Sequence, residues 1–160
     1  MARTKKTGVP IDLIEFVLPM PPGQNHLYVN RRNGGRFKNT SHPFFKNIQA
    51  HYLKNKQWID SLEFSGLYEI DRLFCFHYKS IYCKDGRPKK MDVSNRIKAF
   101  DDELCKMIGL DDHLFWRGTE EKILIDDDTE EECVLVKIKR IEPRTLTEVR
   151  SQSNSKPTTY

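Results

Sequence analysis

The sequence predicts an α+β fold, in which a small mixed β-sheet carries two main helices on one face within a single domain. The chain has 160 residues, a length that suits one domain with a hydrophobic core. Strand-like segments and two helix-like segments follow one another in the order strand, loop, helix, strand, helix, strand, strand. One helical layer against one face of the sheet is the simplest way to bury both helices.

The first strand is expected over residues 11–18, where apolar and polar residues nearly alternate. Pro19, Pro21, Pro22 and Gly23 end it, because proline cannot continue the hydrogen-bonding ladder. Residues 23–40 predict a basic, polar loop or short hairpin that turns at 33–35, Asn-Gly-Gly. The preceding residues 1–10 are basic and predict a flexible arm.

A helix is expected from about Pro43 to Trp58, with Ser41 as its cap and apolar residues near helical spacing. Residues 67–78 predict a long strand. The lysine-rich residues 79–91, with Gly86 and Pro88, predict a loop.

The second helix is expected from Val93 or Ser94 to Met107, and Gly109 is placed to cap its end. Its buried face is formed by residues at helical spacing: Ile97, Phe100, Leu104 and Ile108.

Two strands and a polar tail complete the chain. Residues 122–126 predict a strand, although the residues just before them fit no single element, and Asp126–Asp128 forms the following turn. Residues 133–141 predict the last strand. The serine-rich residues 143–160 predict a disordered tail.

The positive charge of the chain gathers in two loops. The net charge of +4 is a weak sign of nucleic-acid binding alone, but clustered cations attract a phosphate backbone. The alternative is that these are ordinary solvated loops. Phe37 lies within the first cluster and either stacks on DNA or belongs to the core. The candidate phosphate-binding residues are Arg31, Arg32, Arg36, Lys38, Lys84, Arg87, Lys89 and Lys90.

Cysteine spacing and hydropathy exclude two classes of protein. None of the four cysteines forms a C-x-x-C pair, so the sequence predicts no zinc site. The longest apolar run is far below the roughly 18 residues that a membrane span needs. We therefore expect a cytoplasmic protein with reduced cysteines and no membrane association.

Residues 89–112 carry the strongest functional signal. A basic run leads to Asp92, and Asn95 and Lys98 follow at helical spacing. Asp111 and Asp112 come directly after the helix, and carboxylates that bracket a helix can meet at one point. Hard cations such as Mg²⁺ prefer such oxygen ligands and can activate water for phosphodiester cleavage.

Each of these residues also has a structural explanation. Asp92 and Asn95 can cap the helix, and Asp112 can belong to a turn. Lys98 can be an ordinary helix-surface partner of Asp102.

Three segments in this order resemble the RusA-type Holliday-junction resolvases, the crossover-junction endodeoxyribonucleases of bacteria and phages. Residues 18–28, LPMPPGQNHLY, are similar to the family's LPxPPSxNxxY segment. Residues 92–99, DVSNRIKA, resemble its DxDNxxK motif, and residues 109–112, GLDD, resemble the acidic pair after its helix. The resemblance covers roughly residues 11–141, most of the chain, and residues 11–142 are expected to form the endonuclease domain.

The resemblance implies a homodimer that binds four-way DNA junctions and nicks two strands with Mg²⁺ or Mn²⁺, in DNA recombination and repair. Asp92, Lys98 and Asp112 then match the catalytic residues, and Asp92 and Asp112, with Asp111 beside Asp112, are the expected metal ligands. Asn95 matches the motif asparagine, and Asn25 is a candidate contact to DNA. A bacterial or phage origin is expected from the family alone.

Ser94 departs from the family pattern, which has a second aspartate at this position. A hydroxyl is a weaker metal ligand than a carboxylate. The alternative function is therefore a junction-binding protein with weak or lost cleavage. Asp101 lies about 10 Å further along the helix and is a poor replacement, whereas Asp71 on the preceding strand is a possible one.

Overall fold

The computed structural model describes residues 11–23, 26, 28–30 and 32–154. Its main sheet has the strand order β1-β6-β4-β5, and only the β4–β5 pair is parallel. The sheet is therefore mixed, which confirms the predicted fold class. The strands are β1 (Leu13–Pro19), β4 (Leu67–His77), β5 (Phe115–Ile125) and β6 (Cys133–Ile141).

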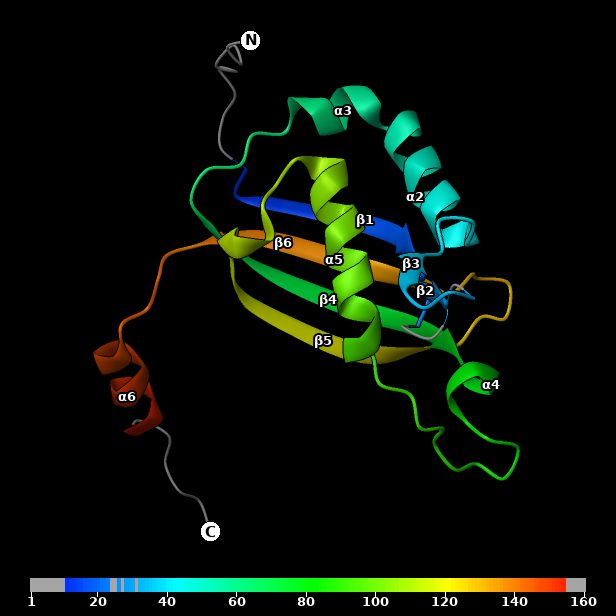
Figure 1. Cartoon of the computed structure of the whole chain (residues 1–160). Helices are drawn as coiled ribbons and strands as arrows, with labels where there is room; N and C mark the ends of the chain where they lie inside the picture. Colours follow the sequence, from blue (N-terminus) through cyan, green and yellow to red (C-terminus); the bar gives the residue numbers. More distant parts are fainter. Residues whose placement is uncertain (1–10, 24–25, 27, 31, 155–160) are drawn as a thin grey trace.

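The helices cover one face of this sheet, as Figure 1 shows, and form a layer of α2 (Pro43–Lys54), α3 (Lys56–Ser61) and α5 (Ser94–Ile108). Alternate residues of β1 and β6 point into this layer and are buried. The aromatic rings of Phe74 on β4 and Phe100 on α5 meet edge to face, with centroids 6.3 Å apart.

A buried ion pair joins β4 to α5 within this apolar layer. Arg72 is 5% exposed, and its guanidinium donates to both carboxylate oxygens of Asp101 at 2.8 and 2.6 Å. Burial raises the pKa of the Asp101 carboxyl, and the bonds from Arg72 oppose that rise. A β-carbon at Gly118 on β5 would lie only 3.1 Å from Arg72 Nη1, so glycine leaves room for the guanidinium.

The helix ends follow local rules. His42 caps α2 by accepting from the amide of Phe44, so the prediction of Ser41 as the cap is wrong. The predicted single helix over 43–58 is two helices, because the backbone of Asn55 leaves the helical conformation (φ −111°, ψ 14°). Gly109 ends α5 in the left-handed conformation (φ 71°), as its position predicts.

One strand, β5, is longer than the sequence predicts. β5 begins at Phe115, well before the expected residue 122, because residues 115–121 gain backbone partners by parallel pairing with β4. The turn at 33–35 does form a hairpin, between β2 (Tyr28–Asn30) and β3 (Arg36–Lys38). The predicted loop over 79–91 contains the last three residues of a short helix, α4 (Tyr78–Ile81).

The C-terminal region departs from the predicted disorder over part of its length. Residues Leu146–Asn154 form helix α6, and residues 155–160 lie outside the described part of the chain. Glu148 accepts from the amide and hydroxyl of Thr145, and the hydroxyl accepts from the amide of Glu148. This is a capping box, and the Thr-x-x-Glu spacing was its signal in the sequence.

In Figure 1, none of the described helices covers the face of the sheet opposite α2, α3 and α5. Leu13, Val17 and Leu135 are exposed there, among charged residues such as Glu15 and Lys137. In the part of the chain that the structure describes, no helix is both long and apolar enough to span a bilayer.

Asp101→Asn is expected to lower the free energy of unfolding by on the order of 3 kcal/mol, because it leaves the buried charge of Arg72 without its partner. Urea denaturation followed by circular dichroism measures the change. Asp102→Asn, at the exposed neighbouring position, is the matched control and is expected to change stability by less than about 0.5 kcal/mol. Equal losses in the two variants would contradict a stabilising role for the buried pair.

Candidate functional site

Most of the predicted site residues gather at one end of the sheet, where β1, β4 and β5 finish and α5 begins (Figure 1). Arg96 in the first turn of α5 holds the proline-rich segment there. Its guanidinium donates to the backbone oxygen of Pro21 and lies over the ring of Phe76, 5.7 Å from the centroid. The proline-rich segment and the aspartate–asparagine–lysine segment, far apart in the sequence, therefore meet at this end.

Asp92 presents an exposed carboxylate immediately before α5. Its Oδ1 accepts from the amide of Ser94 at 2.9 Å. The Ser94 hydroxyl and amide, together with the nearby charge of Lys122, lower the pKa of this carboxyl. Asp92 is therefore ionised at neutral pH and available to a cation.

Ser94, Asn95 and Lys98 are exposed on the first turns of α5. Ser94 and Lys98 are four residues apart and share one side of the helix. The segment from Asp92 to Lys98 therefore lies at the N-terminal end of α5, where Asp92 accepts from the amide of Ser94.

The acidic pair lies elsewhere, beyond the C-terminal end of α5. Asp111 accepts from the amide of His113 and pairs with its Nδ1 at 2.7 Å, which lowers the pKa of Asp111. Asp112 begins the short helix η1 (Asp112–Leu114), directly before β5. Its charge helps to raise the pKa of Asp101, after the larger effect of burial, so Asp112 lies near the buried ion pair.

Asp92 and Asp112 are far apart within one chain. The 15 residues of α5 that separate them span about 20 Å. The length of β5 gives a similar distance. Lys122 marks the position of Asp92, because it donates to the backbone oxygen of Met91, and Phe115 follows Asp112 closely in the chain. These two residues of β5 lie about 23 Å apart along the strand. The expectation that the two carboxylates meet at one point is therefore wrong for a single chain, because a straight helix holds them apart.

The side chains predicted to bind magnesium are not grouped together within one chain. Among the described residues, no three His, Cys, Asp or Glu side chains are grouped to hold a metal. Asp101 is bound to Arg72. Asp71 accepts from Thr119 on the face of the sheet opposite α5, so it cannot replace the carboxylate missing at Ser94.

The hairpin cations have distinct environments. Arg32 is exposed in the turn, and Arg36 lies over the ring of Tyr28, 5.4 Å from its centroid. Lys38 instead donates to Glu103 on α5 at 2.6 Å, so its charge is largely neutralised. Asn25 and Arg31 lie outside the described residues.

The lysine-rich loop, residues 82–91, follows α4 and leads directly to Asp92 and α5. Arg87 pairs with Asp85 at 2.7 Å, and Lys89 donates to the backbone oxygen of Lys79. Lys84 and Lys90 are exposed. The loop therefore offers fewer uncommitted cations than its composition predicts.

Three residues that hold the segments of the site in place were assigned no role from the sequence. They are Lys122, Arg96 and Glu103. Lys122 is 30 residues from Asp92, and only the parallel pairing of β5 brings them together. Arg96 lay inside the recognised motif, but nothing in the sequence pointed to its contact with Pro21.

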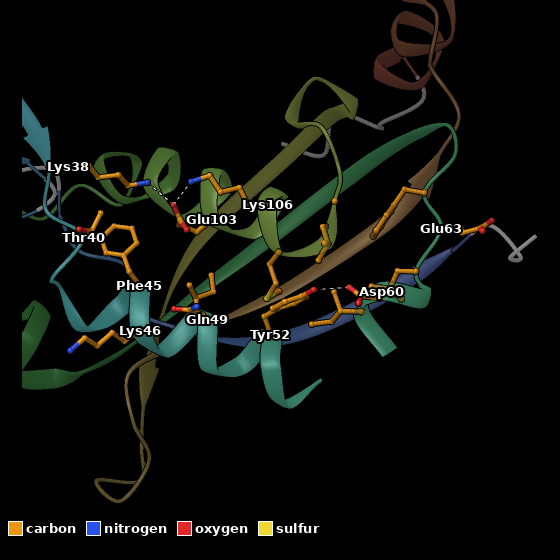
Figure 2. Close-up of a pocket in the computed structure, with 17 residues that line it drawn as sticks. Lys38, Thr40, Phe45, Lys46, Gln49, Tyr52, Asp60, Glu63, Glu103 and Lys106 are labelled. Carbon is orange, nitrogen blue, oxygen red and sulfur yellow. Dashed lines mark hydrogen bonds and ion pairs between the residues drawn. The ribbon is translucent and has the colours of Figure 1, made fainter. Parts of the chain in front are cut away.

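A groove of about 1040 Å³ lies between α2, α3 and the C-terminal half of α5. Figure 2 shows Lys38 and Lys106 both directed at Glu103, and Tyr52 directed at Asp60. Of the predicted site residues that the structure describes, Lys38 alone lines this groove. The candidate site is thus an exposed, charged surface and lies apart from this groove.

Comparison with known proteins adds no assignment. The sequence matches no model of a protein family, and it has no significant match among curated proteins. The functional argument therefore depends on the residues and their geometry.

Proposed function

We propose that this protein is a metal-dependent endodeoxyribonuclease that resolves four-way DNA junctions by paired nicks, acting as a homodimer with Mg²⁺ or Mn²⁺. The observation that carries the proposal is the position of Asp92. Its ionised, exposed carboxylate lies at the end of the sheet that also holds the basic hairpin and the lysine-rich loop. A cation-binding group beside phosphate-binding groups is the arrangement that phosphodiester cleavage requires. The three RusA-like segments support the same class of substrate.

The surrounding cations suit a DNA backbone. Arg32 and Arg36 project from the hairpin, and Lys84 and Lys90 are exposed on the loop. Such contacts hold DNA without reading its sequence, as a structure-selective enzyme needs. Lys98, on the same side of α5 as Ser94, is placed to stabilise charge that develops on a phosphate bound at Asp92.

The proposal requires two chains, because one chain separates Asp92 from Asp112 by the length of α5. A two-fold axis that sets two α5 helices antiparallel would bring Asp92 beside Asp112 of the partner subunit. The same operation creates a second, identical pair of carboxylates. Two equivalent sites then correspond to two nicks on a junction with two-fold symmetry.

A second candidate function, a junction-binding protein without strong cleavage, is favoured by one observation. Ser94 is the first residue of α5, and no acidic residue occupies the first turn of this helix. A site with one carboxylate fewer attracts a divalent cation less strongly. The basic hairpin and loop would bind DNA in either case.

The proposed enzyme is expected to nick a synthetic four-way junction, but not a linear duplex, in Mg²⁺ or Mn²⁺ and not in EDTA. Asp92→Asn is expected to lower the nicking rate by at least roughly a hundredfold, because it removes the charge that holds the cation. Denaturing gel electrophoresis of labelled strands measures the rate. Asp126→Asn, an exposed acid at the same end of the sheet, is the control and should nick like wild type. Metal-independent nicking, or full activity in Asp92→Asn, would refute the proposed enzyme.

The two-chain site predicts complementation between inactive variants. Asp92→Asn and Asp112→Asn are each expected to be inactive, whereas refolding them together should restore about a quarter of wild-type nicking. This fraction arises because half of the dimers are mixed, and each mixed dimer contains one intact site out of two. Absence of recovery, with mixed dimers verified by mass spectrometry, would show that the two acids do not act across the dimer.

Ser94→Asp distinguishes the two candidate functions. For the enzyme, the added carboxylate is expected to lower the Mg²⁺ concentration for half-maximal nicking by roughly tenfold. Ser94→Asn has nearly the same shape without the charge and should leave that concentration unchanged. A wild-type protein that binds junctions without nicking at any Mg²⁺ concentration, together with an active Ser94→Asp variant, would instead establish the binding protein.

A further inference from the structure

The two strands of the hairpin give it two unlike faces. Val29 pairs with Phe37, while Tyr28 pairs with Lys38 and Asn30 with Arg36. Successive side chains of a strand point to opposite faces, so Val29 and Phe37 share one face and the other four residues share the opposite one. The hairpin therefore has a small apolar face and a polar, cationic face.

The polar face of the hairpin is attached to the body of the protein. Lys38 donates to Glu103 on α5, and Glu103 also accepts from Lys106 at 2.9 Å. The Lys38 ammonium lies 4.9 Å from the ring centroid of Phe45 on α2. Figure 2 shows Lys38 reaching toward α5 from the edge of the groove. These contacts fix the orientation of the hairpin.

The apolar face consequently points to solvent. Val29 is 41% exposed and Phe37 is 43% exposed. The sequence left open whether Phe37 stacks on DNA or belongs to the core, and its exposure excludes the core. Gly34 and Gly35 both have positive φ at the tip of the hairpin, and neither carries a side chain that could cover this apolar pair.

We infer that Val29 and Phe37 form a wedge that inserts at the branch point of a DNA junction and stacks against the bases there. This inference rests on the proposed function. Bases at a branch point are held by stacking less firmly than bases inside a duplex, and an aromatic ring can take the place of a stacking neighbour without regard to sequence. Arg32 and Arg36 in the same hairpin match the charge of the adjacent phosphates. Apolar wedges flanked by cations are a general means of opening base steps.

The wedge also explains how a surface without a cleft can select branched DNA. The cations attract any duplex equally, because phosphates are present in all DNA. At a branch point the continuous stack of base pairs is interrupted, so Phe37 can separate a base from its neighbour there at a lower cost than inside a duplex. Selectivity should therefore depend on the apolar face, and total affinity on the cationic residues.

The test uses the full chain in EDTA with a four-way junction that carries 2-aminopurine at the branch point. Wild-type protein is expected to increase the 2-aminopurine fluorescence as the base loses its DNA neighbour. Phe37→Ala should lose more than half of this increase and bind the junction roughly tenfold more weakly, with duplex affinity unchanged. Phe37→Trp should retain the increase, since it keeps a ring for stacking. Trp116→Ala, which removes a 59%-exposed aromatic ring at the opposite end of the sheet, should behave as wild type.

Three results would overturn the inference, and they differ in what else they affect. Phe37→Ala with wild-type fluorescence and junction affinity would refute the wedge and leave the proposed nuclease intact. A Phe37→Ala variant that changes only the oligomeric state in sedimentation would assign this face to contact between copies of the chain. Failure of wild-type protein to bind any junction at low salt would refute the proposed function and the wedge together.

Discussion

Arg72 leaves the sheet at β4 and binds both carboxylate oxygens of Asp101 in the middle of α5. This pair lies among apolar side chains, beside the contact between Phe74 and Phe100. A buried charge tolerates little displacement of its partner, because separation would leave both groups desolvated and unpaired. The pair therefore fixes where α5 crosses the sheet, and Gly118 on β5 provides the space that the guanidinium needs. The positions of Asp92, Lys98 and the hairpin anchor Glu103 all follow from the placement of this helix.

A helix fixed in this way has consequences for chemistry. Asp92 lies before the first residue of the helix and Asp112 lies after its last residue. The two acids that resemble one set of metal ligands in the sequence are therefore separated in space by the length of the helix. Homodimerisation is then a requirement of the proposed chemistry as well as a way to cut two strands. The same helix binds the basic hairpin through Glu103 and Lys38. The proposed catalytic carboxylate and the proposed wedge thus share one rigid support.

The sequence was informative where local rules decide the structure. Alternation in β1 and β6, the Asn-Gly-Gly turn and the glycine after α5 each determine a local conformation, and each predicted element is present. It was uninformative where distant segments meet. The parallel pairing that extends β5 to Phe115, and the contact of Lys122 with Met91, depend on strand neighbours that no local pattern specifies. The site shows the same division: the Asp92-to-Lys98 segment was predictable from helical spacing, whereas its distance from Asp112 required the path of the chain. A helix at Leu146–Asn154 was missed although Thr145 and Glu148 had the spacing of a capping box.

In the described part of the chain the helices cover one face of the sheet, and this divides the residues of its strands into two classes. Ile14, Phe16, Val134 and Val136 face the helices and are buried, so a change in their volume disturbs packing. Their sequence neighbours Val17 and Leu135 are exposed, and there any residue that favours an extended backbone suffices. As the sequence diverges, substitutions should therefore accumulate at every second position of β1 and β6. In relatives of this protein, the buried alternate positions of β1 and β6 should remain similar, whereas the exposed positions between them should vary.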